Sequence, residues 1–255
     1  MGKQNPFLFK EISRTEHWRV PEIILTQCLK HPNRKIIEFT DGPEWTFKDL
    51  KIKSLHKARI LKNLNLKTGD SLTVIIEDPK EFILYWIASN FLGVIFVALN
   101  TAVKGKGLLH QINTSKSKHV IVDNLFFDEV NDLKNNNKLD VEILNCSELK
   151  NKEIINENEV IFGKLSDNVC TMFTSGTSGP SKGVMMPNAH CVLFAIGTIE
   201  NYDLKHDHVF YISLPLFHAN GLFMQLLACI ITGAKAIIRN RFSASNWLKD
   251  IRKYG

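Results

Sequence analysis

The sequence has few cysteines, and none of them are closely spaced. Its 255 residues include five, an odd number, and no two form a CxxC pair. Neither a disulfide framework nor a zinc site is therefore indicated, and buried reduced thiols are the simpler expectation. The five are Cys28, Cys146, Cys170, Cys191 and Cys229.

Long apolar runs are also absent. The two longest apolar segments, near residues 82–99 and 222–231, are interrupted by Ser89, Asn90, Gly93 and Gln225. Both fall short of the roughly 20 apolar residues that a membrane helix needs. The opening residues, MGKQNPFLFKEISR, lack the apolar centre of a signal peptide. We therefore expect no membrane span and a cytoplasmic location.

Concentrated charge is missing as well. The formal net charge is +6, but the lysines recur singly, as in KDLKIKSLHKARILKNLNLK. No basic run is interleaved with aromatic residues, so we expect no nucleic-acid partner. The His206/His208 pair has no acidic or thiol cluster at ligand spacing, so no metal-ligating residues are assigned.

Strand patterns alternate with helix patterns along the chain. This alternation predicts an α/β protein whose mostly parallel, doubly wound sheets are covered on both faces. Expected helix starts are a capping box of Thr46 with Asp49, Asp78 before Pro79, and Asn188. The last helix is expected to be capped by Ser243 or Ser245. The expected strands are 35–39, 45–47, 71–77, 94–100, 119–123, 141–145, 168–174, 183–187, 208–215 and 234–240. The expected helices are about 46–63, 79–93, 105–116, 125–134, 188–201, 219–232 and 243–255.

Polar stretches suggest how the chain is divided. Residues 131–138 and 147–159 are rich in Asn, Lys and Glu and read as solvated connections. The strand–helix pattern starts again at residue 168. We therefore expect an N-terminal α/β lobe over 1–160 and a second lobe over 161–255.

The most distinctive stretch is TMFTSGTSGPSKG, residues 171–183, which follows an apolar strand directly. A Gly, Ser and Thr loop presents backbone N–H groups and hydroxyls with little bulk, so it can wrap an oxyanion, and Lys182 adds a positive charge. The loop does not fit the Walker A pattern, because Ser181 precedes Lys182 and Gly183 follows it. It does not fit GxGxxG either. On composition alone, a flexible linker or surface hairpin remains an alternative.

The loop resembles the phosphate-binding loop of the adenylate-forming superfamily, which includes acyl-CoA synthetases, peptide-synthetase adenylation domains and luciferases. Thr174 to Gly183 fit the pattern [Thr/Ser]-Ser-Gly-[Thr/Ser]-[Thr/Ser]-Gly-x-[Pro/Ser]-Lys-Gly. Ser178 stands where Thr is commoner, and Pro180-Ser181 replace the usual x-Pro order. Further segments resemble the same enzymes, so the likeness covers nearly the whole chain. They are WTFKDL, PKEFILYWIASNFLGVIFVALN, YISLPLFHANGL and FSASNWLKDIRKYG.

The resemblance implies roles for individual residues. The β- and γ-phosphates of ATP would be held by Thr174, Ser175, Gly176, Thr177, Ser178 and Gly179. Lys182 would neutralise part of their charge and help pyrophosphate leave. His218 would line the acyl or carboxylate pocket, although a structural histidine is an equal alternative. Its pocket neighbours would be Phe217, Asn220 and Gly221.

The resemblance implies an AMP-forming acid–thiol ligase that uses ATP, Mg²⁺ and coenzyme A on a small-molecule carboxylic acid. The LPLFH and FSAS segments favour fatty acid or carnitine/crotonobetaine types. The superfamily's later segments (aromatic-Gly-x-Thr-Glu and Thr-Gly-Asp) do not occur in the 255 residues. We therefore expect a truncated amino-terminal portion without full turnover, and self-association at an exposed sheet edge. The alternatives are a non-catalytic nucleotide- or acyl-binding module and a structural scaffold.

Overall fold

The chain forms two compact units, each described here by itself. The computed structural model describes residues 5–137, 139–151, 153–174 and 179–254. Unit 1 combines Met1–Lys53 with Asn188–Gly255, and unit 2 is the continuous stretch Ser54–Pro187. Helix α2 (Phe47–Asn63) contains the boundary between them.

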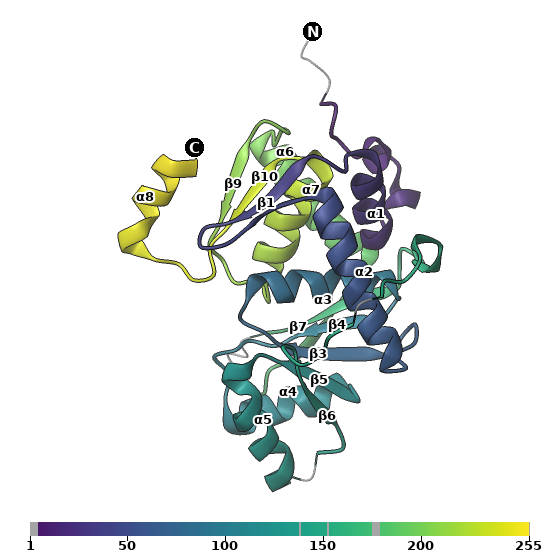
Figure 1. Ribbon diagram of the computed structural model, residues 1–255, viewed down its shortest axis with the longest axis vertical. Coiled ribbons are helices and arrows are strands. Elements are labelled where there is room, and N and C mark those ends of the chain that lie inside the picture. The colour runs from purple at the N-terminus through teal and green to yellow at the C-terminus, as the bar shows by residue number, and fades with distance from the viewer. Residues whose placement is uncertain (1–4, 138, 152, 175–178, 255) are drawn as a thin grey trace. The chain divides into compact units, whose positions relative to one another are not determined.

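Unit 2 is built on a six-stranded sheet in the order β6-β5-β3-β4-β7-β8. All neighbouring pairs are parallel except β7 with β8, which are antiparallel. Figure 1 labels β3, β4, β5, β6 and β7 of this sheet. Each strand before β8 therefore ends at the same edge, where ligand sites gather in α/β proteins. The strands are β3 (Ser71–Ile75), β4 (Ile95–Ala98), β5 (His119–Val122), β6 (Glu142–Asn145), β7 (Asn168–Phe173) and β8 (Gly183–Pro187).

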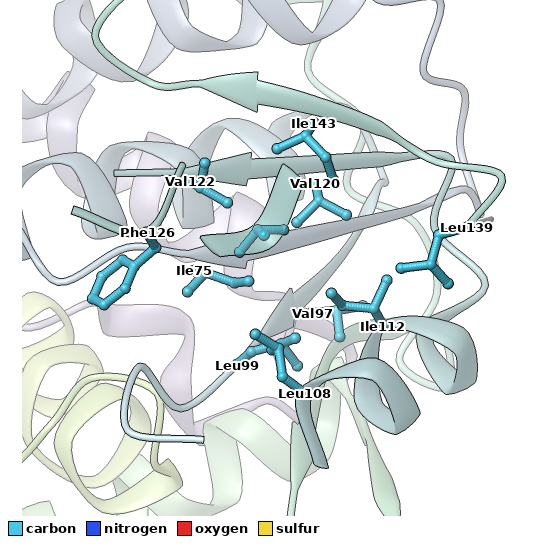
Figure 2. Packing of buried hydrophobic residues seen from close by; sticks show 11 residues of the cluster. Ile75, Val97, Leu99, Leu108, Ile112, Val120, Val122, Phe126, Leu139 and Ile143 are labelled. Carbon is cyan, nitrogen blue, oxygen red and sulfur yellow. The ribbon is translucent and has the colours of Figure 1, made fainter. Parts of the chain in front are cut away.

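Helices cover both faces of this sheet, as the alternating pattern predicts. On one face, α4 (Gly105–Ser115) and α5 (Asn124–Asn137) enclose a hydrophobic cluster with β3, β4, β5 and β6 (Figure 2). On the other face, α3 (Pro79–Phe91) packs Phe82 against Phe96 of β4, with ring centroids 5.1 Å apart. A short 3₁₀ helix, η3 (Glu157–Glu159), precedes β7. The cluster comprises Ile75, Val97, Leu99, Leu108, Ile112, Val120, Val122, Phe126, Val130, Leu139 and Ile143.

Unit 1 is built on a four-stranded sheet in the order β2-β1-β10-β9. The strands β1, β10 and β9 are parallel, and β2 pairs with β1 in the antiparallel sense. The strands are β1 (Lys35–Phe39), β2 (Glu44–Thr46), β9 (Val209–Ile212) and β10 (Lys235–Ile238). The helices are η1 (Lys10–Ser13), η2 (Thr15–His17), α1 (Val20–Lys30), α6 (Asn188–Tyr202), η4 (Asn220–Leu227), α7 (Ala228–Thr232) and α8 (Ala244–Tyr254).

Two of the predicted helix starts carry the expected side-chain hydrogen bonds. Asp49 N donates to Thr46 Oγ1 while Thr46 N donates to Asp49 Oδ2, which is a reciprocal capping box. Asp78 accepts from the backbone N–H of Lys80 and precedes Pro79 at the first helical position. Ser243, rather than Ser245, stands immediately before α8. The mostly parallel, doubly wound α/β class is confirmed.

The structure groups the chain differently from the expected division at residue 160. Strand β7 pairs with β4 inside unit 2, whereas β10 pairs with β1 inside unit 1. Residues 147–159 are not a solvated connection throughout. Ile155 is fully buried, and its backbone N–H donates to Leu55 O. The burial of Ile155 removes apolar surface from water, and contacts of His56 with Glu153 O and of Arg59 with Ile154 O also hold this stretch against α2.

No helix in the described part of the chain is long and apolar enough to cross a membrane.

Candidate functional site

The glycine-rich loop joins the two strands of the antiparallel hairpin β7–β8 at the edge of the unit 2 sheet. It follows the carboxyl end of β7, as the strand pattern predicts. Four of its predicted phosphate-binding residues (Ser175, Gly176, Thr177 and Ser178) lie outside the described residues. The described ends of the loop are Thr174 and the segment from Gly179 to Lys182.

Two hydrogen bonds, one between backbone groups and one to a side-chain hydroxyl, close the neck of this loop. Thr174 N donates to Lys182 O at 3.0 Å, and Lys182 N donates to Thr174 Oγ1 at 3.3 Å. Both residues are exposed, so the Lys182 ammonium is available to a ligand. Gly179 has a φ of +153°, a conformation that residues with a Cβ rarely adopt.

Two residues of α4 that no sequence motif marks contact the loop. In α4, Gln111 Nε2 donates to Ser181 Oγ at 3.0 Å, and His110 Nε2 lies 2.9 Å from Ser181 O. Because the carbonyl can only accept, the imidazole carries the proton in this contact. No local pattern marks these residues, since they lie about 70 positions before Ser181.

The second group of predicted site residues lies in unit 1, at the carboxyl end of β9. The segment after this strand turns back on itself: His218 N donates to Pro215 O, and Leu222 N donates to His218 O, both at 3.1 Å. The ring of Phe217 lies edge-on to the ring of His218, with centroids 4.6 Å apart. Phe217, His218, Asn220 and Gly221 are thus brought together by one turn.

Position 221 requires glycine because the backbone leaves no space there for a Cβ atom. A Cβ there would lie 2.7 Å from Pro215 O and 2.9 Å from Leu214 O, closer than real Cβ contacts. Gly221 lies in a π-helix, η4, which spans Asn220–Leu227. The sequence predicts an ordinary α-helix over 219–232. The π-helical winding is rare and is often found at functional sites. Asn220 Oδ1 accepts from Gln225 Nε2 at 3.0 Å within η4.

His218 favours the neutral imidazole. Although the residue as a whole is exposed, desolvation of its ring lowers the pKa of His218 below its ordinary value of 6.5. A neutral ring can accept or donate a hydrogen bond without repelling or neutralising a nearby charge. This property suits a pocket residue, and it suits a structural histidine equally well.

The described residues hold no group of three or more His, Cys, Asp or Glu side chains that could bind a metal ion. All five cysteines are buried and none is in a disulfide, as expected from their spacing. Burial raises the pKa of the Cys170 and Cys229 thiols well above the usual range, so both remain protonated and unreactive.

The described site residues therefore form two groups, one in each unit. Thr174, Gly179 and Lys182 stand at the glycine-loop neck of unit 2. Phe217, His218, Asn220 and Gly221 stand on the turn of unit 1.

Known proteins of one kind match this chain along most of its length. It is 30% identical to the 2-succinylbenzoate–CoA ligase of Bacillus licheniformis over 75% of the chain and 39% of that protein. It is 24% identical to the mouse long-chain fatty acid transport protein 6 over 94% of the chain and 41% of that protein. The chain thus spans about two fifths of the length of these curated relatives.

Solved structures agree with the sequence relatives. The o-succinylbenzoate CoA synthetase of Bacillus subtilis in complex with its acyl-adenylate intermediate has a TM-score of 0.81 and 26% identity, covering 91% of this chain and 59% of that one. The same enzyme in complex with ATP and a magnesium ion has a TM-score of 0.80 and 25% identity, covering 91% of this chain and 60% of that one. The family described as AMP-binding enzyme matches residues 24–255. The chain belongs to the AMP-binding enzyme family.

Proposed function

We propose that this chain is part of an AMP-forming acid–thiol ligase. In the first step, a carboxylate oxygen attacks the α-phosphorus of ATP, and the bond to the β-phosphate oxygen breaks to give an acyl-adenylate and pyrophosphate. In the second step, the thiolate of coenzyme A attacks the acyl carbonyl carbon and AMP leaves. The carrying observation is the loop neck, which presents exposed Lys182 beside Thr174 in a member of the AMP-binding family.

The residues of the neck suit the first step. Attack by a carboxylate on a phosphate brings two anions together, so cationic and N–H donors lower its barrier. We propose that the loop holds the β- and γ-phosphates and that Lys182 balances the charge on the departing pyrophosphate. The described residues offer no cluster of metal ligands. Mg²⁺ would enter with the nucleotide and add positive charge beside the phosphates.

The turn of unit 1 suits the acid substrate. We propose that His218, Phe217, Asn220 and Gly221 line the acyl pocket. Its occupant would be a fatty acid or an acid of the carnitine/crotonobetaine type, as the LPLFH and FSAS segments favour. Support for a CoA-linked acid comes from relatives named CoA ligases. We also propose a cytoplasmic location, supported by five buried cysteines that form no disulfide.

Calorimetry with ATP and Mg²⁺ tests the loop. Lys182→Ala should weaken ATP binding by about tenfold or more, because a charge-assisted contact to phosphate contributes roughly 1.5–3 kcal/mol. The matched control is Lys118→Ala, which removes the same charge from the amino end of β5, whereas the loop follows the carboxyl end of β7. Equal binding by the Lys182→Ala variant and the unsubstituted chain would contradict the role of this lysine.

An activity assay separates the ligase from a binding module. A longer protein containing this chain should catalyse pyrophosphate exchange into ATP only when a carboxylic acid is present. ATP binding without acid-dependent exchange would favour the non-catalytic module.

A further inference from the structure

The exit of the glycine loop is held by a helix from an earlier part of unit 2. Helix α4 packs beside β8, the strand that the loop enters. It carries His110 and Gln111, and both of their side chains contact Ser181, the residue immediately before Lys182. Neither His110 nor Gln111 belongs to a motif recognised in the sequence.

Gln111 is a buried amide whose contact with the loop is specific. The residue is 4% exposed, and its Nε2 donates to Ser181 Oγ at 3.0 Å. Its Oε1 is buried and has no hydrogen-bond partner among the described residues. A buried amide without partners is costly, so the single bond to Ser181 strongly favours one position of the loop exit.

His110 completes the restraint. Its Nε2 donates to Ser181 O at 2.9 Å, so Ser181 is held at its hydroxyl and at its carbonyl. The next residue, Lys182, is held to Thr174 at its own backbone N–H and C=O. The backbone of Lys182 is therefore held in two ways. Helix α4 holds the preceding residue, Ser181, and Thr174 at the end of β7 bonds Lys182 directly.

The residue at position 181 explains why such a restraint matters here. The superfamily pattern usually has proline at this position, and proline restricts its own φ. Serine imposes no such limit, but its hydroxyl can form a hydrogen bond. We propose that His110 and Gln111 are positioning residues that fix the loop exit and so aim Lys182 for phosphate binding, a role that rests on the proposed function.

Amide hydrogen exchange of the loop neck tests the restraint without any ligand. Gln111→Met keeps the buried volume and removes the hydrogen bond, and Ser181→Ala removes it from the other side. Each should speed exchange at the neck amides by about fivefold, and the double variant should be no faster than either single variant. The matched control is Asn113→Ala, an exposed residue on the same helix that should leave the neck unchanged.

The second measurement is the affinity for ATP and Mg²⁺. Gln111→Met should weaken ATP binding by about fivefold while its unfolding midpoint stays at that of the unsubstituted chain. A role in bulk stability alone would instead move the midpoint and leave ATP binding unchanged below it.

The two proposals fail in different ways. Unchanged neck exchange in Gln111→Met and Ser181→Ala, or effects that multiply in the double variant, would overturn the positioning role. Absence of ATP binding by the unsubstituted chain would overturn the phosphate-binding function. The restraint by α4 would then be judged on exchange alone.

Discussion

The two groups of site residues are held in place by different means. The neck of the glycine loop in unit 2 depends on side chains of α4, a separate element. The turn that carries His218 in unit 1 depends on its own backbone, through hydrogen bonds between residues three and four positions apart and the missing side chain of Gly221. A turn held by its own backbone can be recognised in a sequence. The side chains with which a distant helix holds a loop can be recognised only in a structure.

The largest loss of stability is expected when a side chain is added at Gly221, in the turn of unit 1. Gly221→Ala would place a Cβ within 3 Å of two backbone carbonyl oxygens, Pro215 O and Leu214 O, which cannot move aside easily. The free energy of unfolding should fall by about 1–3 kcal/mol, as for other overpacked sites. Urea denaturation followed by circular dichroism measures the change.

The control for this variant is Gly197→Ala in the middle of α6. A Cβ there meets nothing within 4 Å, and alanine favours a helix, so stability should be unchanged or rise by up to about 1 kcal/mol. If the two alanine variants were equally stable, the close approach at Gly221 would not be limiting.

A smaller loss of stability is expected when the hydrogen bond between Ser181 at the loop neck and Gln111 of α4 is removed. Ser181→Ala leaves the buried Gln111 amide without its bond, which should cost about 1 kcal/mol of unfolding free energy. Adding Gln111→Met should restore most of the loss, because both partners are then apolar. Thermal unfolding of the two variants measures it. A double variant less stable than Ser181→Ala would show that the amide has another role.

The smallest effect concerns His218 and pH. Because desolvation lowers the pKa of His218, the folded state binds its proton less readily than the unfolded state does. The contribution to stability is complete above the ordinary pKa of 6.5 and is lost as the pH falls below it. His218→Asn should therefore lose less stability than the unsubstituted chain between about pH 7.5 and about pH 5.5.

The readout for this prediction is the slope of the unfolding midpoint against pH. His31 also has a pKa lowered by burial, so part of the slope should remain in His218→Asn. Equal slopes for both proteins would mean that the ring of His218 is hydrated in the folded state.

Local patterns predicted most of the elements and little of their pairing. The capping box at Thr46 and the cap at Asp78 follow from residues a few positions apart, and both were confirmed. The pairing of Ile37 with Ala236 joins distant parts of the chain, and no periodicity announces it. The burial of Ile155 within a polar stretch was missed for a related reason. A single apolar residue has no period.

The candidate site divides in the same way. The glycine loop and the Leu-Pro-Leu-Phe-His segment are recognisable because their chemistry lies in consecutive residues. Gln111 and His110 read as ordinary helix residues, and their contact with Ser181 arises only when β8 is placed beside α4. The π-helical winding of η4 could not be predicted from the sequence either, because its apolar residues suit an α-helix equally well.

Unit 1 is made of two stretches that are far apart in the chain, and this has a consequence for folding during synthesis. Unit 2 is a continuous stretch, so all of its strands leave the ribosome together. In unit 1, Arg34 donates to Gly233 O, 199 residues later, and β1 pairs with β10 beside it. At roughly 5–20 residues per second, the first part of unit 1 waits about 10–40 s for its partner. The middle of the chain can therefore finish folding while the beginning still needs protection.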